Sequence, residues 1–422
     1  MTSRLFADAL AIGTQWTREL DLVSLTTKRL EASGLLDPHV AIDVVAVGKA
    51  AREMSDAASI VLGARLHRRL TICDEASAGN GGRSSDVVVG EHPLAGAGSQ
   101  RAGTTLVAFL EGPTSADVTL FLVSGGASSL CVVPEVPVTL DDLRGVWDAA
   151  TTTGVDITTL NQLRASSSAI AGGAVLRRVR TARSQSLIMV DNVVSGAEWV
   201  ASGLTYDYQP SGDDVMELLV RVGLNDTPLG DRLLEASRRR AHAMKSSITT
   251  RHENTVLADP SLMLEVAVTE ARRRGYRVVD MGSHVHGDVE DVSAHWAAVV
   301  RAESSTGDSI AVLGAGEVTV RVRGTGTGGR CQEFAWFMAK VTAELDREAC
   351  FVARASDGRD FVDGVGGAWV QRSTLERARR SGLDWAEIAR TNDSHSALAG
   401  LGQLLEGGHT GWNLCDLYVT LT

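Results

Sequence analysis

Residues 42–63 read IDVVAVGKAAREMSDAASIVLG, a short apolar run that passes directly into a longer helical pattern. The run IDVVAVG (42–48) is typical of a buried β-strand, and the residues after it are typical of a helix. The same arrangement returns at VTLFLVSGG (118–126) and SLIMVDN (186–192). Apolar strands separated by helices indicate a parallel sheet that is covered on both faces. We therefore predict a doubly wound α/β fold for the N-terminal part of the chain.

The length of the chain, 422 residues, predicts two domains, because one ordinary core does not grow to this size. The charged pattern PLGDRLLEASRRRAHAMKS (228–246) is a candidate connection between them. The strand patterns that follow it, with a helical pattern near 260–274, predict a second α/β unit. We expect the domains to cover residues 1–240 and 241–422.

Composition narrows the class of protein. A net charge of −11 and a pI near 5.4 argue against a surface for nucleic acid or anionic membranes. Five scattered cysteines without a CxxC pair favour reduced thiols in a cytoplasmic protein. The first residues, MTSRLFADALAIGTQW (1–16), carry Asp8 inside their apolar stretch, so we expect an amphipathic helix and no signal peptide. No apolar run is long enough to span a bilayer.

Polar residues follow three of the predicted strands, where ligands bind in parallel sheets. Lys49 follows the first strand, SGGASSL (124–130) follows the second, and Asp191 follows the third. The glycines and serines of SGGASSL place free backbone N–H groups at a turn, which suits an anion. A surface lysine, a tight βα turn and a helix-capping aspartate remain the structural alternatives.

The stretch IAVLGAGEVTVRVRGTGTGGRCQEF (310–334) adds glycines beside arginines, which fits either a surface hairpin or a backbone cradle for an anion. The turn SGGASSL fits neither GxGxxG nor GxxxxGK[ST]. The segment ASDGRDFVDG (355–364) lacks the spacing of a calcium loop. Lysine, arginines, aspartates and anion-binding turns together favour phosphoryl transfer over hydride transfer.

The order of the motifs resembles the glycerate 2-kinase family, whose C-terminal half is the MOFRL domain and some of whose members are called hydroxypyruvate reductases. The matching motifs are VGKA, EHPLAG, SGGASSL, RASSSAIAGG, ASGLT, GAGEVTVRVRGTGTGGRCQEF, SDGRDFVDGVGG, NDSHS and HTGWNLCD. The resemblance implies a Rossmann-like domain, a MOFRL domain and an active site in the cleft between them. It implies ATP- and Mg²⁺-dependent phosphorylation of the 2-hydroxyl of D-glycerate, with metal ligands that stay unknown.

The resemblance also implies roles for particular residues. The catalytic candidates are Lys49, Arg330 and Asp191. The candidates for binding nucleotide or phosphate are Ser124, Gly125, Gly126, Ser128, Glu317, Arg323, Gly328 and Gly329. The candidates for the substrate pocket are Arg164, Ser168, Asp357 and Trp412.

The chain departs from the family pattern at three places. Where the family reads close to RKHLSxIKGG, residues 164–173 read RASSSAIAGG, with Ala165 and Ala171 at lysine positions. The proline, glycine and paired acids usual after Asp191 are absent, and the last polar turn carries His409 and Trp412. The loss of two lysines removes positive charge from the site, so we expect an acceptor that differs from glycerate: a related hydroxy acid, polyol or cyclitol.

Two other functions stay open at this point. A catalytically silent relative that binds a ligand or a partner protein is the first, because the acids usual after Asp191 are absent and the loss of a metal ligand can abolish turnover. An NAD(P)H-dependent reductase is the second, and the lack of a GxGxxG turn after the first predicted strand, where the chain reads GKAARE (48–53), weakens it. We expect a small-molecule substrate and a nucleotide as partners, and a homodimer is left open.

Overall fold

The computed structural model describes residues 4–78, 85–244 and 248–422. Contacts between residues divide the chain into two compact units. The parallel-sheet unit consists of residues 22–258, and the mixed-sheet unit consists of residues 1–21 and 259–422. Each unit has its own sheet and its own hydrophobic core.

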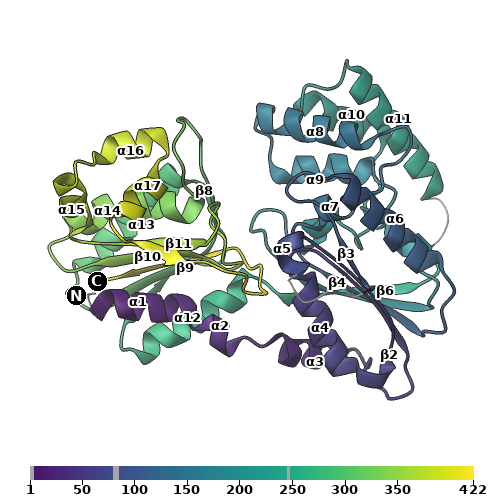
Figure 1. Ribbon diagram of the computed structural model, residues 1–422, viewed down its shortest axis with the longest axis horizontal. Coiled ribbons are helices and arrows are strands. Elements are labelled where there is room, and N and C mark those ends of the chain that lie inside the picture. Colours follow the sequence, from purple (N-terminus) through teal and green to yellow (C-terminus); the bar gives the residue numbers. More distant parts are fainter. Residues whose placement is uncertain (1–3, 79–84, 245–247) are drawn as a thin grey trace. The chain divides into compact units, whose positions relative to one another are not determined.

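The six strands of the parallel-sheet unit all run in the same direction, in the order β3-β2-β1-β4-β5-β6 (Figure 1). This is the strand order of a Rossmann fold, with its switch point between β1 and β4. The doubly wound sheet predicted from the sequence is thereby confirmed. The strands are β1 (Ile42–Val47), β2 (Leu66–Cys73), β3 (Val87–Val89), β4 (Val118–Val123), β5 (Arg183–Met189) and β6 (Arg251–Ala258).

Helices cover both faces of this sheet, as the fully buried strands β1 and β4 require. Helices α8, α9, α10 and α11 additionally pack on one another around a core of their own. The helices are α3 (Leu22–Ala32), α4 (Ala51–Leu62), α5 (Glu75–Ala78), α6 (Ala97–Glu111), α7 (Ala127–Leu130), α8 (Leu140–Thr153), α9 (Ile157–Ser166), α10 (Gly212–Arg221) and α11 (Pro228–Ala243).

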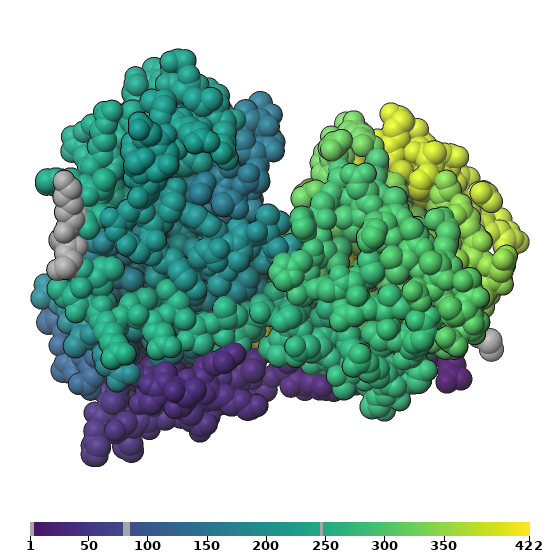
Figure 2. All heavy atoms as spheres, turned by 180° about the vertical axis from the view of Figure 1, so that it is seen from behind, coloured from purple at the N-terminus to yellow at the C-terminus, as the bar shows by residue number. Residues whose placement is uncertain are grey.

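The mixed-sheet unit has strands in the order β12-β11-β10-β13-β9-β7, with β8 also paired to β9. Helices α1 and α12 contact one side of the sheet and α14 contacts the other (Figure 1). Figure 2 shows the units from behind, where green segments cover most of the visible face of the mixed-sheet unit. The second α/β unit is confirmed. Its strands are β7 (Arg277–Asp280), β8 (Val285–Asp288), β9 (Ile310–Thr319), β10 (Cys350–Ala355), β11 (Val365–Gln371), β12 (Leu404–Glu406) and β13 (Asp416–Leu421).

The helices of the mixed-sheet unit include the N-terminus of the chain. They are α1 (Arg4–Thr14), α2 (Trp16–Glu19), α12 (Pro260–Arg273), α13 (Val289–Ser304), α14 (Arg330–Glu344), α15 (Thr374–Arg380), α16 (Trp385–Thr391) and α17 (Ser394–Gly400). The expected amphipathic helix is α1, and Asp8, which interrupts its apolar stretch, pairs with Arg274 and accepts a hydrogen bond from the Tyr276 hydroxyl at 2.9 Å.

The division into units differs from the domain bounds 1–240 and 241–422 that the sequence suggested. Strand β6 pairs with β5, which extends the parallel-sheet unit to Ala258. Helix α1 packs on β10 and β13, which places the first 21 residues in the other unit. The charged helix α11, expected as a connection, packs against α9 and α10 through Leu233 and Ala236 instead.

The cysteines Cys73, Cys131, Cys331, Cys350 and Cys415 are buried free thiols. Burial raises the pKa of Cys73 and Cys131 to about 12, so neither is a ready nucleophile. Across the described ranges of the chain, no helix is long and apolar enough to cross a bilayer.

The switch point supplies a test of the fold. At Gly48, with φ +132°, an added Cβ would lie 2.2 Å from the Ser124 Oγ, whereas at Gly63, with φ +54°, it would meet nothing within 4 Å. Both substitutions by alanine strain the backbone, but only Gly48→Ala also separates β1 from β4. We expect Gly63→Ala to lower the free energy of unfolding by about 1 kcal/mol and Gly48→Ala by more than about 3 kcal/mol. Chemical denaturation of both variants measures the difference, and equal losses would contradict this account.

Candidate active site

Two predicted catalytic residues and the predicted phosphate-binding turn meet at the carboxyl edge of the parallel sheet. Lys49 follows β1, the turn at Ser124 follows β4, and Asp191 follows β5. Val47 is in register with Val123, and Val123 with Ile188, so the three strands end at the same level. The connections from β1 and β4 leave toward opposite ends of the sheet, which opens a crevice above this pair.

The turn after β4 is tied to the end of β1. The Lys49 N–H donates to the Gly125 carbonyl at 2.9 Å, and the Ser124 Oγ accepts from the Ala50 N–H at 3.1 Å. Gly126 has φ +82°, and a Cβ built there would lie 3.0 Å from the Lys49 Cγ and 3.3 Å from the His92 Cδ2. The Lys49 side chain therefore lies along the turn, beside His92.

The backbone of this turn is a ready anion site. The N–H groups of Gly125, Gly126, Ala127 and Ser128 donate to no acceptor within the part of the chain that the structure describes. Gly125 and Ala127 are buried, so these donors lack both protein partners and full access to water. Since α7 has only four residues, the individual N–H donors and not a long helix dipole would hold an anion.

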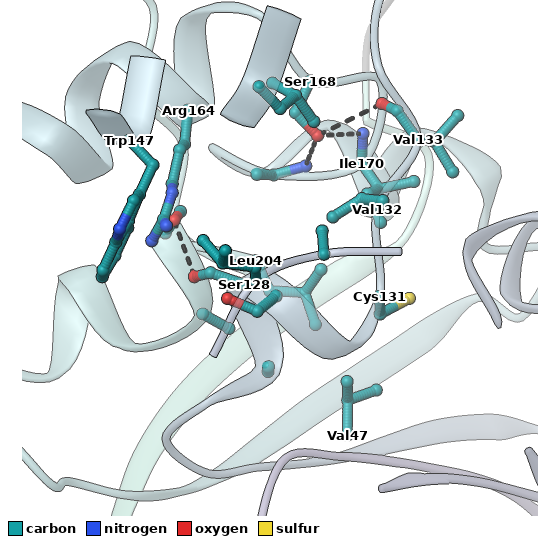
Figure 3. A pocket seen from close by; sticks show the side chains of 18 of the residues that line it. Val47, Ser128, Cys131, Val132, Val133, Trp147, Arg164, Ser168, Ile170 and Leu204 are labelled. Carbon is teal, nitrogen blue, oxygen red and sulfur yellow. Dashed lines mark hydrogen bonds between the residues drawn. The ribbon is translucent and has the colours of Figure 1, made fainter. Parts of the chain in front are cut away.

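A pocket opens next to the turn (Figure 3). It is lined by Ser128 of the turn, Arg164, Trp147, Ser168 and Ala171, among others. Arg164 runs alongside Trp147 toward Ser128, and its guanidinium lies 5.1 Å from the Trp147 ring centroid. The predicted pocket residues Arg164 and Ser168 thus lie with the predicted phosphate turn in one cavity of the parallel-sheet unit.

Arg164 is the unusual residue of this pocket. Its guanidinium makes no hydrogen bond or ion pair with any described residue, and its stacking on Trp147 leaves the N–H donors unused. Burial lowers the pKa of Arg164 to about 10, which still leaves the group charged at neutral pH. Removing a cation from water without a counter-charge costs free energy, so an anionic group bound in this pocket would be stabilised by Arg164.

Asp191 lies just beyond β5, partly buried. The segment after it forms a tight turn, in which the Asn192 Oδ1 accepts from the Ser195 N–H at 3.0 Å. Asparagine and serine thus close the turn in which the family pattern carries acids. Over residues 4–78, 85–244 and 248–422, no group of three or more His, Cys, Asp or Glu side chains is placed to hold a metal ion.

The predicted residues of the mixed-sheet unit are arranged differently. Arg330 is the first residue of α14, and its Nε and Nη2 donate to the Asp416 carboxylate at 2.6 and 3.0 Å. Its Nη1 lies 2.9 Å from the Glu317 Oε1. Burial lowers the pKa of Arg330, but the Asp416 and Glu317 carboxylates outweigh it and raise that pKa well above its usual value. The donor fork expected to face phosphate is engaged by the protein's own carboxylate.

The glycines before α14 serve close packing. A Cβ on Gly328 would lie 2.2 Å from the Ser394 Oγ, and one on Gly329 would lie 2.2 Å from the Asp360 Oδ1. The Asp360 carboxylate accepts from the Cys331 N–H at 3.1 Å and the Gln332 N–H at 2.9 Å, which caps α14. The anion at this helix N-terminus is therefore Asp360, so the predicted phosphate contacts of Gly328 and Gly329 have no direct support here.

The other predicted residues of this unit make contacts of their own. Arg323 is exposed and pairs with Glu290, which raises the pKa of Arg323. Asp357 accepts a hydrogen bond from the Arg359 N–H at 2.9 Å. Trp412 is buried and packs edge-on against Trp16, with ring centroids 6.4 Å apart. The Trp412 ring thus packs in the core beside α1 and α2. This packing does not support the prediction that Trp412 lines a substrate pocket.

Sequence reasoning missed Asp360, Asp416 and Trp147. Asp360 belongs to ASDGRDFVDG, a segment from which only Asp357 was taken as a candidate. A lone aspartate before a β-branched strand, as Asp416 is, carries no readable signal, because its partner Arg330 is 86 residues away. Trp147 lies on a helix whose pattern indicated only packing.

Known families match most of the chain. Residues 15–233 match a domain of unknown function, DUF4147, and residues 310–416 match the MOFRL family. The first match covers more than half of the chain. The chain belongs to the DUF4147 family, and it carries a MOFRL domain.

Curated relatives of this chain are named glycerate kinase or glycerate 2-kinase. A glycerate kinase of Bos taurus is 28% identical, with 92% of this chain and 80% of the relative covered. A glycerate 2-kinase of Pyrococcus horikoshii is 26% identical, with 99% of this chain and 96% of the relative covered. The crystal structure of a glycerate kinase from Thermotoga maritima has a TM-score of 0.81 at 23% identity over 99% of both chains, which shows a shared fold. The resemblance inferred from the motifs is confirmed.

The cap on α14 predicts an unusual pH dependence. Burial, with the Asp416 carboxylate nearby, raises the pKa of Asp360 from its ordinary value of 3.8 to about 6. Between these values the folded state holds more protons than the unfolded state, so the free energy of unfolding falls as the pH rises from about 4 to about 6. Asp360→Asn removes this titration. Denaturation between pH 4 and 7 should therefore show the wild type losing stability relative to Asp360→Asn as the pH rises.

The matched control for this experiment is Asp363→Asn, an exposed position in the same loop. It should follow the wild type at every pH. A constant difference in stability between the wild type and Asp360→Asn would show that Asp360 does not titrate in this range.

Proposed function

We propose that this chain is an ATP-dependent kinase that transfers a phosphoryl group to a hydroxyl of glycerate or a closely related small hydroxy acid. The observation that carries the proposal is the half-buried Arg164, whose guanidinium makes no hydrogen bond or ion pair with a described residue and lies in a pocket beside the turn after β4. One site thereby offers a cation for a carboxylate and backbone donors for a phosphate. The names of the curated relatives support the same reaction.

The pocket residues divide the work of binding. Arg164 would hold the carboxylate of the acceptor with its free N–H donors, which gives a planar, bidentate contact. The Ser168 hydroxyl accepts from the Ala171 N–H at 3.1 Å and shapes the wall opposite. An acceptor held at these points keeps its hydroxyl groups toward the turn that begins at Ser124.

The turn and Lys49 would act on the transferred group. Phosphoryl transfer needs positioning and cationic charge around the equatorial oxygens of phosphorus more than covalent help. The four free N–H groups of residues 125–128 and the Lys49 ammonium supply that charge at one edge of the sheet. Asp191, after the neighbouring strand, is the carboxylate that would hold Mg²⁺ or orient the acceptor hydroxyl.

Magnesium fits this arrangement as a partner of the nucleotide. The ion is normally bound through one or two carboxylates plus substrate phosphates, so a preformed cage of three protein ligands is not required. It would neutralise charge on the phosphate oxygens of ATP. Arg330 stays a predicted catalytic residue, and any contact with phosphate would exchange against its bond to Asp416.

A nicotinamide-dependent reductase fits the site less well. In a Rossmann fold the dinucleotide lies on a glycine-rich turn after β1, and here that turn is Gly48-Lys49-Ala50. Gly48 is in close contact with Ser124, so its backbone is not open to a pyrophosphate.

Removal of the Arg164 charge should weaken binding of the acceptor alone. We expect Arg164→Met to raise the KM for D-glycerate about 10- to 100-fold, since a charge-assisted hydrogen bond contributes about 1.5–3 kcal/mol. The KM for ATP should stay within about twofold, because Arg164 lies at the acceptor end of the pocket. Steady-state kinetics measure both constants.

Glycerol, which lacks the carboxylate, is the control acceptor. It should be a poor acceptor for the wild type and equally poor for Arg164→Met. An unchanged KM for D-glycerate in Arg164→Met would remove the role assigned to this residue.

Lys49→Ala should act on turnover. We expect kcat to fall at least 100-fold with little change in either KM, because the ammonium stabilises charge that develops in the transition state. Arg52→Ala, in the next helix and paired with Asp56, is the control and should keep wild-type kinetics. Wild-type protein that binds ATP but phosphorylates no hydroxy acid, polyol or cyclitol would favour the silent relative instead.

A further inference from the structure

Two strained turns face each other at the wall of the pocket. Gly172 and Gly173 have φ of +55° and +75°, and opposite them Ala201 and Ser202 have φ of +58° and +52°. The Gly172 N–H donates to the Ser202 carbonyl at 3.1 Å, and the Gly173 N–H donates to the Gly203 carbonyl at 2.9 Å. Alanine and serine rarely adopt this conformation, so the surrounding structure must enforce it.

The turns shape the pocket directly. Ala171, Ala201 and Ser202 all line it, and the Ser202 hydroxyl is 2.7 Å from the Ser128 hydroxyl of the amide turn. A shift of either strained turn would therefore move the wall of the pocket and the phosphate side together.

Arg240 of α11 holds the first turn from behind. Its Nη2 donates to the Gly172 carbonyl at 2.6 Å and to the Ala171 carbonyl at 3.2 Å, while its Nη1 donates to the Tyr208 carbonyl at 2.8 Å. The side chain is 3% exposed. Its contacts are thus with carbonyls of the turn and of the segment beside it, and not with solvent.

Small residues leave the space that the guanidinium occupies. A Cβ on Gly172 would lie 2.4 Å from the Arg240 Nη2 and 3.3 Å from the Ala165 Cβ. Ala165 is itself fully buried, so this position faces the protein interior and does not line the pocket. Ala165 therefore helps to leave room for the Arg240 guanidinium.

The charge of Arg240 is not neutralised by an ion pair. No carboxylate in the described ranges lies within ion-pair distance of it, and its buried Nε has no acceptor there. The nearby Asp207 lies 3.6 Å from Arg177. Burial lowers the pKa of Arg240 to about 10, which keeps the group protonated at neutral pH. The segment 165–172 thus follows one cation, the half-buried Arg164, and ends at the contact with a second, the buried Arg240.

We propose that Arg240 is a positioning residue for the acceptor: it clamps the Ala171–Gly173 turn and adds positive potential behind the pocket that Arg164 opens. This inference rests on the proposed kinase function and assigns the acceptor an anionic group. Arg240 contacts the wall and not the acceptor, so it acts through the shape and the field of the pocket.

Arg240→Met and Arg240→Lys test the proposal in the full-length chain. We expect Arg240→Met to raise the KM for D-glycerate at least tenfold, with the KM for ATP within twofold and kcat reduced less than tenfold. Arg240→Lys keeps the charge and one or two of the three carbonyl bonds, so its KM for D-glycerate should lie between those of the wild type and Arg240→Met. The control is Arg239→Met, since Arg239 is exposed and pairs with Glu235 one turn earlier.

Gly172→Ala tests the contact between Arg240 and Gly172 by changing the turn and leaving Arg240 in place. The new methyl group would displace the guanidinium, so the KM for D-glycerate should rise as it does in Arg240→Met. Gly154→Ala is its control, because Gly154 also has a positive φ of +67° but has no neighbour within 4 Å of an added Cβ. If Arg240→Met fails to fold, Arg240→Lys and Gly172→Ala give the result.

Two results would overturn the proposal. The first is a folded Arg240→Met with a KM for D-glycerate within twofold of the wild type. The second is a parallel rise of both KM values, which would indicate a general structural role. If the wild type phosphorylates no acceptor, the proposed kinase function is wrong, but the role of Arg240 can still be tested. Calorimetry then measures the binding of D-glycerate and of inorganic phosphate to each variant. Weaker binding to Arg240→Met than to Arg239→Met would then support the clamp, and equal or absent binding would overturn it.

Discussion

The close contact between β1 and β4 is the constraint on which the candidate site depends. Gly48 and Ser124 approach so closely that no side chain fits between them, and this contact fixes the turn that carries the free N–H donors. Lys49 leaves β1 at the same point, so one backbone contact places a cation and four amide donors at a single edge. Parallel pairing alone would bring the strand ends together, but the missing Cβ sets their register at the level of the turn.

The two units treat negative charge in opposite ways. In the parallel-sheet unit, the N–H donors of residues 125–128 and of the Arg164 guanidinium have no acceptor within the described residues, and an anion would relieve the cost of their desolvation. In the mixed-sheet unit, Asp360 satisfies the start of α14, and Asp416 and Glu317 satisfy Arg330. Binding of an anion is therefore favoured by open donors in the first unit, whereas in the second it must compete with internal carboxylates.

The fold and the segments at the edge of the parallel sheet could be predicted from the sequence, whereas the contacts of Arg330 and Arg240 could not. Apolar strands such as β1 and β4 are buried on both faces, so their composition alone predicts a parallel sheet, and the residues after them predict its binding edge. The contacts of Arg330 with Asp416 and of Arg240 with Gly172 join residues 86 and 68 positions apart, and no local pattern announces them. The glycine-rich stretch was visible, but whether glycine serves a ligand or close packing depends on the neighbour, here Ser394 and Asp360. The neighbour also decides the meaning of Ala165. Its sequence position indicated the loss of a lysine charge, but in the structure the Arg240 guanidinium lies beside it.

The route of the chain has a consequence for its biosynthesis. Residues 1–21 belong to the mixed-sheet unit, yet the strands on which α1 packs begin only at Cys350 and Asp416. The parallel-sheet unit is thus an insertion, complete once residue 258 has left the ribosome, and it can fold while the rest is being made. Helix α1 also contacts α12, but its contacts with β10 and β13 can form only after those strands have been synthesised. The segment on the N-terminal side of the insertion therefore completes its packing only against strands that come from the C-terminal side.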